Sequence, residues 1–407
     1  MSWKVTWRDT ADTYVIKKEE ATTELKVLEV IEKRLKDKVR DISVTMQPPQ
    51  LTPGGVPFPD IISAFREKKV VPFLGAGVPF SGRPEGADWR QGASFLPSGA
   101  ELARHLAFLC NLPAWSIRDT DNLARVASYY TISNPNSDLT EELRTIFAGG
   151  SPTGVHQMLA ELKLHPGMLI VTTNYDTLME QALDAKGVPY YVVIHCTDIG
   201  HLGSVLVQKP KKQDGTSESE FIEPKDFFVD LKTTTVIYKM HGSISGNAKQ
   251  GSKSFFGNFV ITEEDYVAFL SRISSAPPVV PSLFRTHFGR CSFLFLGYSL
   301  EDWNVRVILD SLNDVINPNA NRDSSAARQL TRTGDPPLPP TSPVAKELKL
   351  QTPTGQESRA SRRHWAIQHQ PSSYDIEVWR GRNVVIRNMD LNVFPRELRT
   401  RAPDLFP

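Results

Sequence analysis

The sequence predicts an α/β protein in which a mostly parallel sheet carries helices on both faces. Two observations lead to this prediction. Three short strands, at 70–74, 168–173 and 292–296, are almost entirely apolar, and amphipathic segments of helical length stand between them. Strands without a polar face are typical of parallel sheets that are buried on both sides. Ligands bind such sheets beside the carboxyl ends of the strands, so the residues that follow each strand are the first candidates for a site.

The composition is that of an ordinary globular chain. Its 407 residues predict two or three domains, or one large domain with extensions. The 47 basic and 46 acidic side chains argue against a protein that binds a polyanion with its whole surface. No run of about 18 apolar residues and no apolar leader occurs, so we expect no membrane span and a cytoplasmic location.

The three cysteines, Cys110, Cys196 and Cys291, are far apart in the sequence and form no CxxC pair. This excludes a four-cysteine zinc site and a disulfide scaffold. We therefore expect buried thiols in a reducing compartment, no zinc module and no metal ligands.

Residues 1–57 are expected to be an extension of the core. Apolar residues recur every three or four positions between residues 21 and 40, which predicts an amphipathic helix. Prolines and glycines between residues 47 and 59 then indicate a linker. The helix would either pack on its own domain or contact a second subunit or a partner.

The core is predicted to span residues 58–316. Its expected helices are 60–68, 98–110, 120–130, 139–147, 177–185, 262–271 and 299–312, and its further strands are 190–195 and 234–240. Thr177 and Glu180 have the spacing of a capping box, which favours a helix that begins there. The polar stretch 207–224 is expected to be an excursion on the surface.

After the core, we expect a proline-rich linker or loop at 317–363 and a carboxyl-terminal segment, 364–407, that packs on the core. Residues 383–386 resemble a strand. Residues 321–407 carry 14 Lys and Arg against 9 Asp and Glu, which fits either a solvated basic face or contact with nucleic acid or an acidic partner.

The first strand end is Gly75-Ala76-Gly77. Glycines let a backbone turn sharply and approach a pyrophosphate closely. The third glycine of a GxGxxG motif is missing, because Phe80 stands in its place. The three residues therefore fit either phosphate binding or a plain turn between a strand and a helix.

The second strand end contains Thr173, Asn174 and Asp176. The amide of Asn174 is suited to hold a water molecule or a ribose hydroxyl. Asp176 either supports the site or caps the following helix.

The last two strand ends carry His241-Gly242 and Gly297-Tyr298-Ser299. A histidine beside a glycine leaves room for a substrate and supplies a base near neutral pH, although a histidine here could also be structural. A small residue and a hydroxyl before a helix suit a phosphate or an adenosine ribose, or Ser299 only caps the helix.

In this order and spacing, the four strand ends resemble the sirtuin-like (silent information regulator two) superfamily. They are most similar to the zinc-free NAD-hydrolase domains of bacterial antiphage defence. The resemblance covers residues 58–312, and residues 364–398 show a weaker similarity. The motifs that carry it are GAG at 75–77, TTNYD at 172–176, HG at 241–242, GYS…DW at 297–303 and ITEEDY at 261–266.

The resemblance implies a Rossmann-like domain that binds NAD and breaks its nicotinamide–ribose bond. The catalytic pair of the family maps to Asn174, which would orient a water molecule or the ribose, and His241, which would act as a base. The same resemblance assigns the binding of NAD to further residues: Gly75, Ala76, Gly77, Thr173, Asp176, Gly297, Tyr298 and Ser299.

Two departures from the family argue against protein deacylation. Deacylating sirtuins carry a four-cysteine zinc module, which three scattered cysteines cannot form. The segment 82–85 also matches the family's GIPDFR-like segment poorly, and Ser81 comes later than the serine that often follows the GAG loop.

The resemblance further implies an effector that depletes NAD in antiphage defence. Because such activity harms the host cell, we expect control by assembly. Chains of this layout are similar to the sirtuin-like partners of HerA-type helicase ATPases. We therefore expect a homo-oligomer, a partner of that kind and contact with nucleic acid through it.

One alternative is a non-catalytic subunit that senses NAD or ADP-ribose within a DNA-processing complex. That function would need neither Asn174 nor His241. An intrinsic nuclease is disfavoured, because the sequence has no convincing carboxylate cluster for two metal ions.

Overall fold

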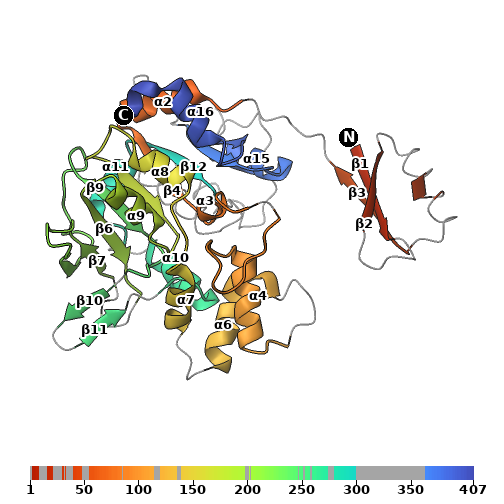
Figure 1. The fold of residues 1–407 in the computed structure, drawn as a ribbon, viewed down its shortest axis with the longest axis horizontal. Coiled ribbons are helices and arrows are strands. Elements are labelled where there is room, and N and C mark those ends of the chain that lie inside the picture. Colours follow the sequence, from red (N-terminus) through yellow and green to blue (C-terminus); the bar gives the residue numbers. More distant parts are fainter. Residues whose placement is uncertain are drawn as a thin grey trace, which may run out of the picture. The chain divides into compact units, whose positions relative to one another are not determined.

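The structure is a computed structural model of the 407-residue chain (Figure 1). It describes residues 2–8, 16–21, 30–31, 33, 40–47, 55–84, 86–113, 120–134, 139–197, 201, 203–245, 247–250, 253–256, 259–273, 279–298 and 363–407. The predicted helix 299–312, Ser299 and nearly all of the predicted linker 317–363 lie outside these ranges.

The chain divides into two compact units, Met1–Gly54 with Pro371–Glu377 and Gly55–Gln370 with Val378–Pro407. The first unit contains an antiparallel sheet in the order β2-β1-β3. Its strands are β1 (Ser2–Arg8), β2 (Ile16–Ala21) and β3 (Arg40–Gln47).

These three strands were not predicted from the sequence. The predicted helix 21–40 is wrong at both bounds, because residue 21 ends β2 and residue 40 begins β3. Within that range, the described residues 30, 31 and 33 are helical. A sequence signal for β1 exists, because Trp3, Val5 and Trp7 alternate with polar residues at the period of a strand.

In the second unit, the described residues form a nine-stranded sheet in the order β14-β13-β12-β4-β5-β9-β6-β7-β8. Neighbouring strands pair in parallel from β14 to β6, and only β6-β7 and β7-β8 are antiparallel. This confirms the predicted mostly parallel α/β sheet. The strands are β4 (Val70–Leu74), β5 (Leu169–Thr172), β6 (Tyr190–His195), β7 (Val205–Gln208), β8 (Ser219–Ile222), β9 (Thr235–Lys239), β12 (Ser292–Leu296), β13 (His364–Gln368) and β14 (Val384–Asn388).

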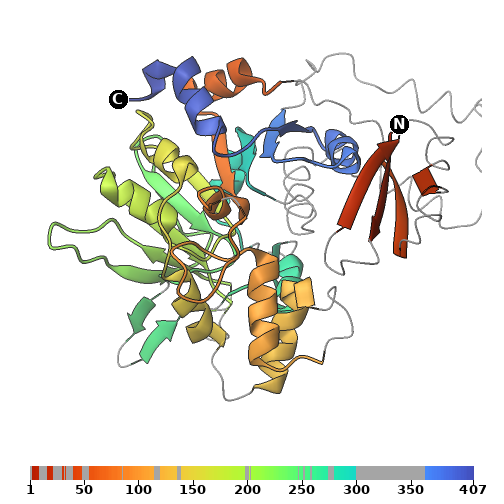
Figure 2. The same ribbon diagram turned by 45° about the vertical axis from the view of Figure 1, so that its right-hand side comes forward.

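Helices cover both faces of this sheet (Figures 1 and 2). On one face, α2 (Phe58–Arg66), α8 (Gly154–Ala160), α9 (Leu178–Ala185) and α16 (Phe394–Arg401) share one apolar core with the strands. On the other face lie α10 (Glu263–Ile273) and α11 (Ser282–Phe288). Phe284 of α11, for example, packs 5.0 Å from the ring of Tyr238 in β9. Burial on both sides explains why these strands have no polar face.

A helical insert separates β4 from β5. It contains α3 (Gly77–Phe80), α4 (Gly99–Leu109), α6 (Leu123–Ser133) and α7 (Leu139–Phe147). The last three helices form a second apolar core, which Tyr175 joins from the segment after β5. The insert therefore packs against the carboxyl edge of the sheet, where the strand-end motifs lie.

Two segments extend the sheet at its ends, and of the strands they supply only β14 was predicted, at residues 383–386. The stretch 207–224, predicted as a surface excursion, contributes to β7 and β8 at one end of the sheet. The carboxyl-terminal segment supplies β13 and β14 at the other end. It also brings α16 beside α2 (Figures 1 and 2). There the rings of Phe58 and Phe394 stack 5.7 Å apart.

The other described elements are the hairpin β10 (Asn247–Gln250) and β11 (Lys253–Phe256), helix α15 (Ser373–Arg380) and the 3-10 turn Pro403–Leu405. Across the described ranges, no helix combines the length and the hydropathy needed to span a lipid bilayer.

Candidate functional site

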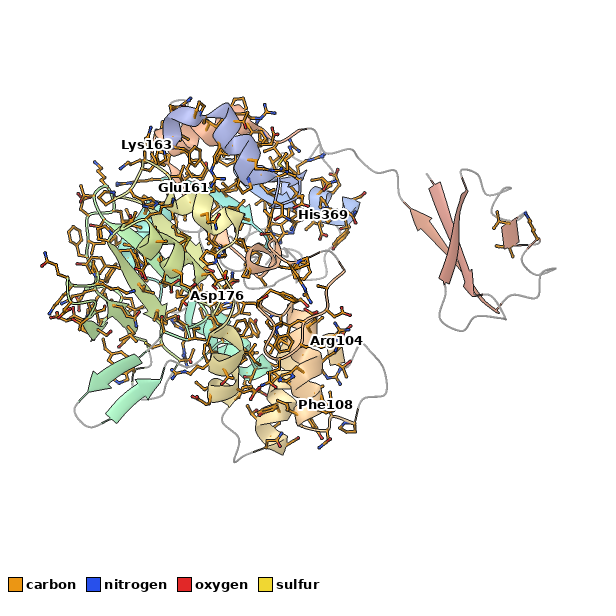
Figure 3. All side chains as sticks on the ribbon, in the orientation of Figure 1. Arg104, Phe108, Glu161, Lys163, Asp176 and His369 are labelled. Carbon is orange, nitrogen blue, oxygen red and sulfur yellow. The ribbon has the colours of Figure 1, made fainter. Side chains whose placement is uncertain are left out.

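A cavity of about 180 Å³ lies at the carboxyl edge of the sheet, under the helical insert. It brings together six of the residues that sequence analysis assigned to the site: Ala76, Thr173, Asn174, Asp176, His241 and Tyr298. The other lining residues are Pro79, Leu96, Pro97, Ser98, Gly99, Leu102, Leu123, Phe147, Tyr175 and Tyr266. Asp176, labelled in Figure 3, marks this position.

Gly75, Gly77 and Gly297 do not line the cavity but bring the loops after β4 and β12 into backbone contact. Gly77 N donates a hydrogen bond to Gly297 O (2.7 Å), and a Cβ on Gly75 would lie 2.6 Å from the same oxygen. Gly297 has φ +62°. Only glycine fits here without displacing backbone, so these residues build the turn that holds Ala76 and Tyr298 at the cavity wall.

The side chain of Asn174 is held in one orientation. Its Nδ2 donates a hydrogen bond to Gly75 O (3.0 Å), and its backbone N–H donates to Thr172 Oγ1 (3.0 Å). The Thr172 hydroxyl in turn donates to Leu74 O (3.1 Å), which ties this strand end to β4. Among the described residues, none donates to Asn174 Oδ1, so this acceptor remains available on a fixed side chain that lines the cavity.

His241 follows β9, the neighbour of β5 in the sheet, and is only 2% exposed. Its ring meets the rings of Tyr266 and Phe269 edge-on, with centroids 5.6 and 5.1 Å apart. Burial lowers the pKa of His241 to about 3. The imidazole is therefore neutral at pH 7 and can accept a proton, but it is a weaker base than the sequence analysis expected.

At the start of α9, Asp176 takes one of its two predicted roles, whereas Thr177 and Glu180 do not take theirs. Thr177 makes no side-chain capping bond, so the predicted capping box is wrong. Asp176 Oδ1 instead accepts a hydrogen bond from Leu178 N (2.9 Å) and caps the helix. Glu180 forms an ion pair instead, because its Oε1 lies 2.8 Å from Nζ of the buried Lys239.

Lys239 ties two of the strand ends together. This lysine is fully buried at the end of β9, two residues before His241, and its ammonium group also donates to the backbone oxygen of Asp176. Burial raises the pKa of the Asp176 and Glu180 carboxyls, and the positive charge of Lys239 opposes that rise. The lysine thereby links the segment that carries Asn174 to the segment that carries His241.

Sequence analysis missed the wall that α4 contributes. Ser98 and Glu101 form the capping box that begins this helix, and Ser-x-x-Glu is a sequence signal that could have found it. Glu101 also binds the guanidinium of Arg83 through two hydrogen bonds, which hold the pKa of that carboxyl well below its usual range. This ion pair fixes the amino end of α4 beside the cavity.

The cavity offers amide, imidazole and carboxyl groups within largely apolar walls. Across the part of the chain that the structure describes, no three His, Cys, Asp or Glu side chains are grouped to hold a metal ion. The fold is that of a Rossmann-like α/β domain, and this cavity is a candidate small-molecule site at the carboxyl edge of its sheet.

Comparisons with known proteins show what this domain is similar to. Residues 168–331 match the model of the SIR2-like domain. Over 275 residues, the chain is 26% identical to the NAD(+) hydrolase ThsA of Acinetobacter baumannii (strain 532279). This match covers 67% of the chain and 45% of that protein, so the chain spans less than half the length of its relative. The predicted resemblance to sirtuin-like proteins is confirmed.

Proposed function

We propose that the protein is an NAD+ glycohydrolase. Water would attack the anomeric carbon of the nicotinamide ribose, the bond from that carbon to nicotinamide would break, and the products would be nicotinamide, ADP-ribose and a proton. The match to the SIR2-like domain and the similarity to an NAD(+) hydrolase support this reaction. The observation that carries it is one cavity lined by an oriented asparagine, Asn174, and a neutral histidine, His241, from neighbouring strands.

Cleavage of the nicotinamide–ribose bond needs little general acid catalysis. Nicotinamide leaves as a neutral molecule, and the ribose passes through an oxocarbenium-like transition state. The site must hold the ribose, exclude bulk water and place one water molecule at the anomeric carbon. A cavity of about 180 Å³ is below the usual 300–1,000 Å³ of a complete small-molecule site, so it would take the nicotinamide riboside part of NAD.

Asn174 and His241 would have different roles in the reaction. Because Gly75 O holds Asn174 Nδ2, the oxygen Oδ1 is the atom that would accept a hydrogen bond from the attacking water or a ribose hydroxyl. His241 would accept the proton that this water loses and release it to solvent. Asp176 would act through α9 and the strand end rather than on the substrate.

The test is nicotinamide release by the purified full-length chain. We expect Asn174→Ala and His241→Ala each to lower the rate at least about 100-fold, in line with the removal of a positioned catalytic group. The matched controls His369→Ala and Asn392→Ala change exposed residues outside the cavity and should keep the wild-type rate.

Wild-type rates in both site variants would refute the assignment of the catalytic pair. Tight NAD binding by the wild-type chain without nicotinamide release, alone or with a partner, would favour the alternative of a subunit that senses NAD or ADP-ribose.

The cellular setting is also part of the proposal. An enzyme that depletes NAD would act in the cytoplasm as an effector of antiphage defence and would need control. We propose that the separate amino-terminal unit mediates assembly, with further copies of the chain and with a HerA-type helicase ATPase that contacts nucleic acid. Co-expression with such an ATPase, followed by size-exclusion chromatography of the full chain and of residues 55–407, tests this. Equal complex formation by both forms would contradict it.

A further inference from the structure

A second buried histidine lies close to the proposed base. His195 ends β6, the strand next to β9, and is 1% exposed. Neither of its ring nitrogens has a hydrogen-bond partner among the described residues. Buried polar groups almost always have a partner, so two such atoms on one side chain require an explanation.

Further unpartnered polar atoms occur in the described residues of β9 and in those that follow β6 and β9, which pair in the sheet. Ile194 of β6 pairs with Lys239 of β9, so His195 and the segment leading to His241 run side by side. Phe269 of α10 contacts both histidines, with ring centroids 5.2 and 5.1 Å away. Three further atoms are sealed without a described partner: Thr197 Oγ1, Tyr238 Oη and His241 Nε2. We call the side chains of His195, Thr197, Tyr238 and His241 the polar seam.

Both imidazoles of the polar seam are neutral. Burial lowers the pKa of His195 to about 3, and the positive charge of Arg272 on α10 and the neighbouring His241 add to this effect. Burial raises the pKa of Tyr238 above its usual value, with a smaller contribution from Cys196. Each neutral imidazole has one N–H donor and one acceptor nitrogen, and each hydroxyl has both functions. A water molecule, which both donates and accepts hydrogen bonds, is a suitable partner for groups of this kind.

A base that works through one ring nitrogen needs a partner for the other. The second N–H fixes the tautomer and stabilises the imidazolium that forms when the base takes a proton. In His241 the sealed nitrogen is Nε2, which has no such partner within the described ranges. Without a partner for Nε2, the imidazolium formed by the proposed reaction would lie in an apolar site. Burial there disfavours the charged form, as the low pKa of this ring indicates.

We propose that buried water in the polar seam joins His241 Nε2 to His195, and that His195 is a positioning residue for His241. The water accepts the Nε2–H of His241 and donates to a ring nitrogen of His195. This arrangement leaves His241 Nδ1 to take the proton from the attacking water. The catalytic consequence rests on the proposed function, whereas the link between the two histidines holds without it.

The experiment compares the full-length wild-type chain with His195→Phe, the conservative His195→Gln and the control His369→Phe, an exposed position. Nitrogen NMR of histidine-labelled protein without NAD reports the tautomer of each imidazole. We expect the Nε2–H tautomer for His241 in the wild type and the control, and a mixture of tautomers in His195→Phe. His195→Gln should restore most of the wild-type signal, because its amide can also bind the water.

Nicotinamide release and its pH profile give the second readout. Loss of a group that orients a catalytic side chain typically costs about 10–100-fold, so we expect that loss in kcat for His195→Phe with little change in KM. The acidic limb of its pH profile should also move relative to the wild type, and His195→Gln should recover much of the rate.

Three outcomes would overturn the proposal. The first is an Nδ1–H tautomer of His241 in the wild-type protein, a result that needs no variant to fold. The second is an unchanged His241 signal in His195→Phe. The third is a His195→Phe protein that is more stable and equally active, as expected if the seam is dry. A wild type that releases no nicotinamide would refute the proposed function alone, because the NMR result still decides the link.

Discussion

Removal of the Lys239 ammonium group should destabilise the protein strongly. The Lys239→Met substitution keeps the length of the side chain but leaves the Glu180 carboxyl in a site that is 7% exposed, without its cation. It also removes the hydrogen bond to the backbone oxygen of Asp176. Breaking a buried ion pair from one side costs about 3–5 kcal/mol, because the remaining charge is uncompensated. Burial already raises the pKa of Glu180, so this carboxyl can become protonated in the variant. Its protonation will keep the loss of stability near the lower end of that range.

The double variant Lys239→Met, Glu180→Leu separates the ion pair from simple packing. Replacing both partners by apolar side chains of similar volume is often neutral for stability. We therefore expect it to recover about 2 kcal/mol or more of the loss seen in Lys239→Met, a coupling of the size found for residues in direct contact. Nicotinamide release should stay low in both variants, because each lacks the bond from Lys239 that links the two strand ends.

Urea denaturation followed by circular dichroism measures these stabilities. The control Lys209→Met breaks an exposed ion pair with Glu220 and should leave the urea midpoint unchanged. A loss below about 1 kcal/mol for Lys239→Met would refute the reasoning, because it would mean that water reaches this lysine. Equal losses in the single and double variants would show that the pair itself contributes nothing.

Three further predictions concern stability. Gly297→Ala would place a Cβ 2.5 Å from a backbone nitrogen at φ +62°, so we expect a loss of about 2 kcal/mol or more in urea and slower nicotinamide release; wild-type values would contradict this. His156, His195 and His241 each have a folded pKa of about 3 against 6.5 for a free side chain. Unfolding therefore takes up protons between these values, and each histidine should remove about 1.4 kcal/mol of stability per unit as pH falls from 6 to 4. His195→Phe should reduce the slope of stability against pH by the contribution of one histidine. An unchanged slope would refute the low pKa assigned to His195. Because the pKa of Glu101 is lowered in the fold, the stability lost in Glu101→Gln should shrink as pH falls below 4.5, and a constant difference between pH 3 and 7 would argue against it.

Much of the fold could be predicted from local pattern. The strands at 70–74, 190–195 and 292–296 have the predicted bounds, because a short apolar run between turn residues has few other solutions. The helix at 139–147 also matches its prediction. Strand β13 (His364–Gln368) was not predicted, because it becomes a strand by pairing with β12, a segment about 70 residues earlier, and with β14.

The candidate site, too, could be predicted from the sequence only in part. The rule that ligands bind at the carboxyl ends of parallel strands predicts Asn174, His241 and four other residues that line the cavity. The spacing Ser98-x-x-Glu101 marks the start of α4, but the place of this helix at the cavity wall depends on the packing of the insert. Thr177 and Glu180 had the spacing of a capping box, but the buried ammonium of Lys239 draws Glu180 away from the helix end.

By itself, the sequence determined the α/β class, the strand ends that carry the site and the SIR2-like resemblance, because all of these depend on residues that are close together in the chain. Only the tertiary structure decided what each polar side chain does. Burial is a property of the whole fold, and it turns His241 from a histidine with an ordinary pKa into a neutral ring with a sealed nitrogen. Contacts between distant segments likewise decided that Lys239 joins the strand ends and that His195 lies beside the proposed base.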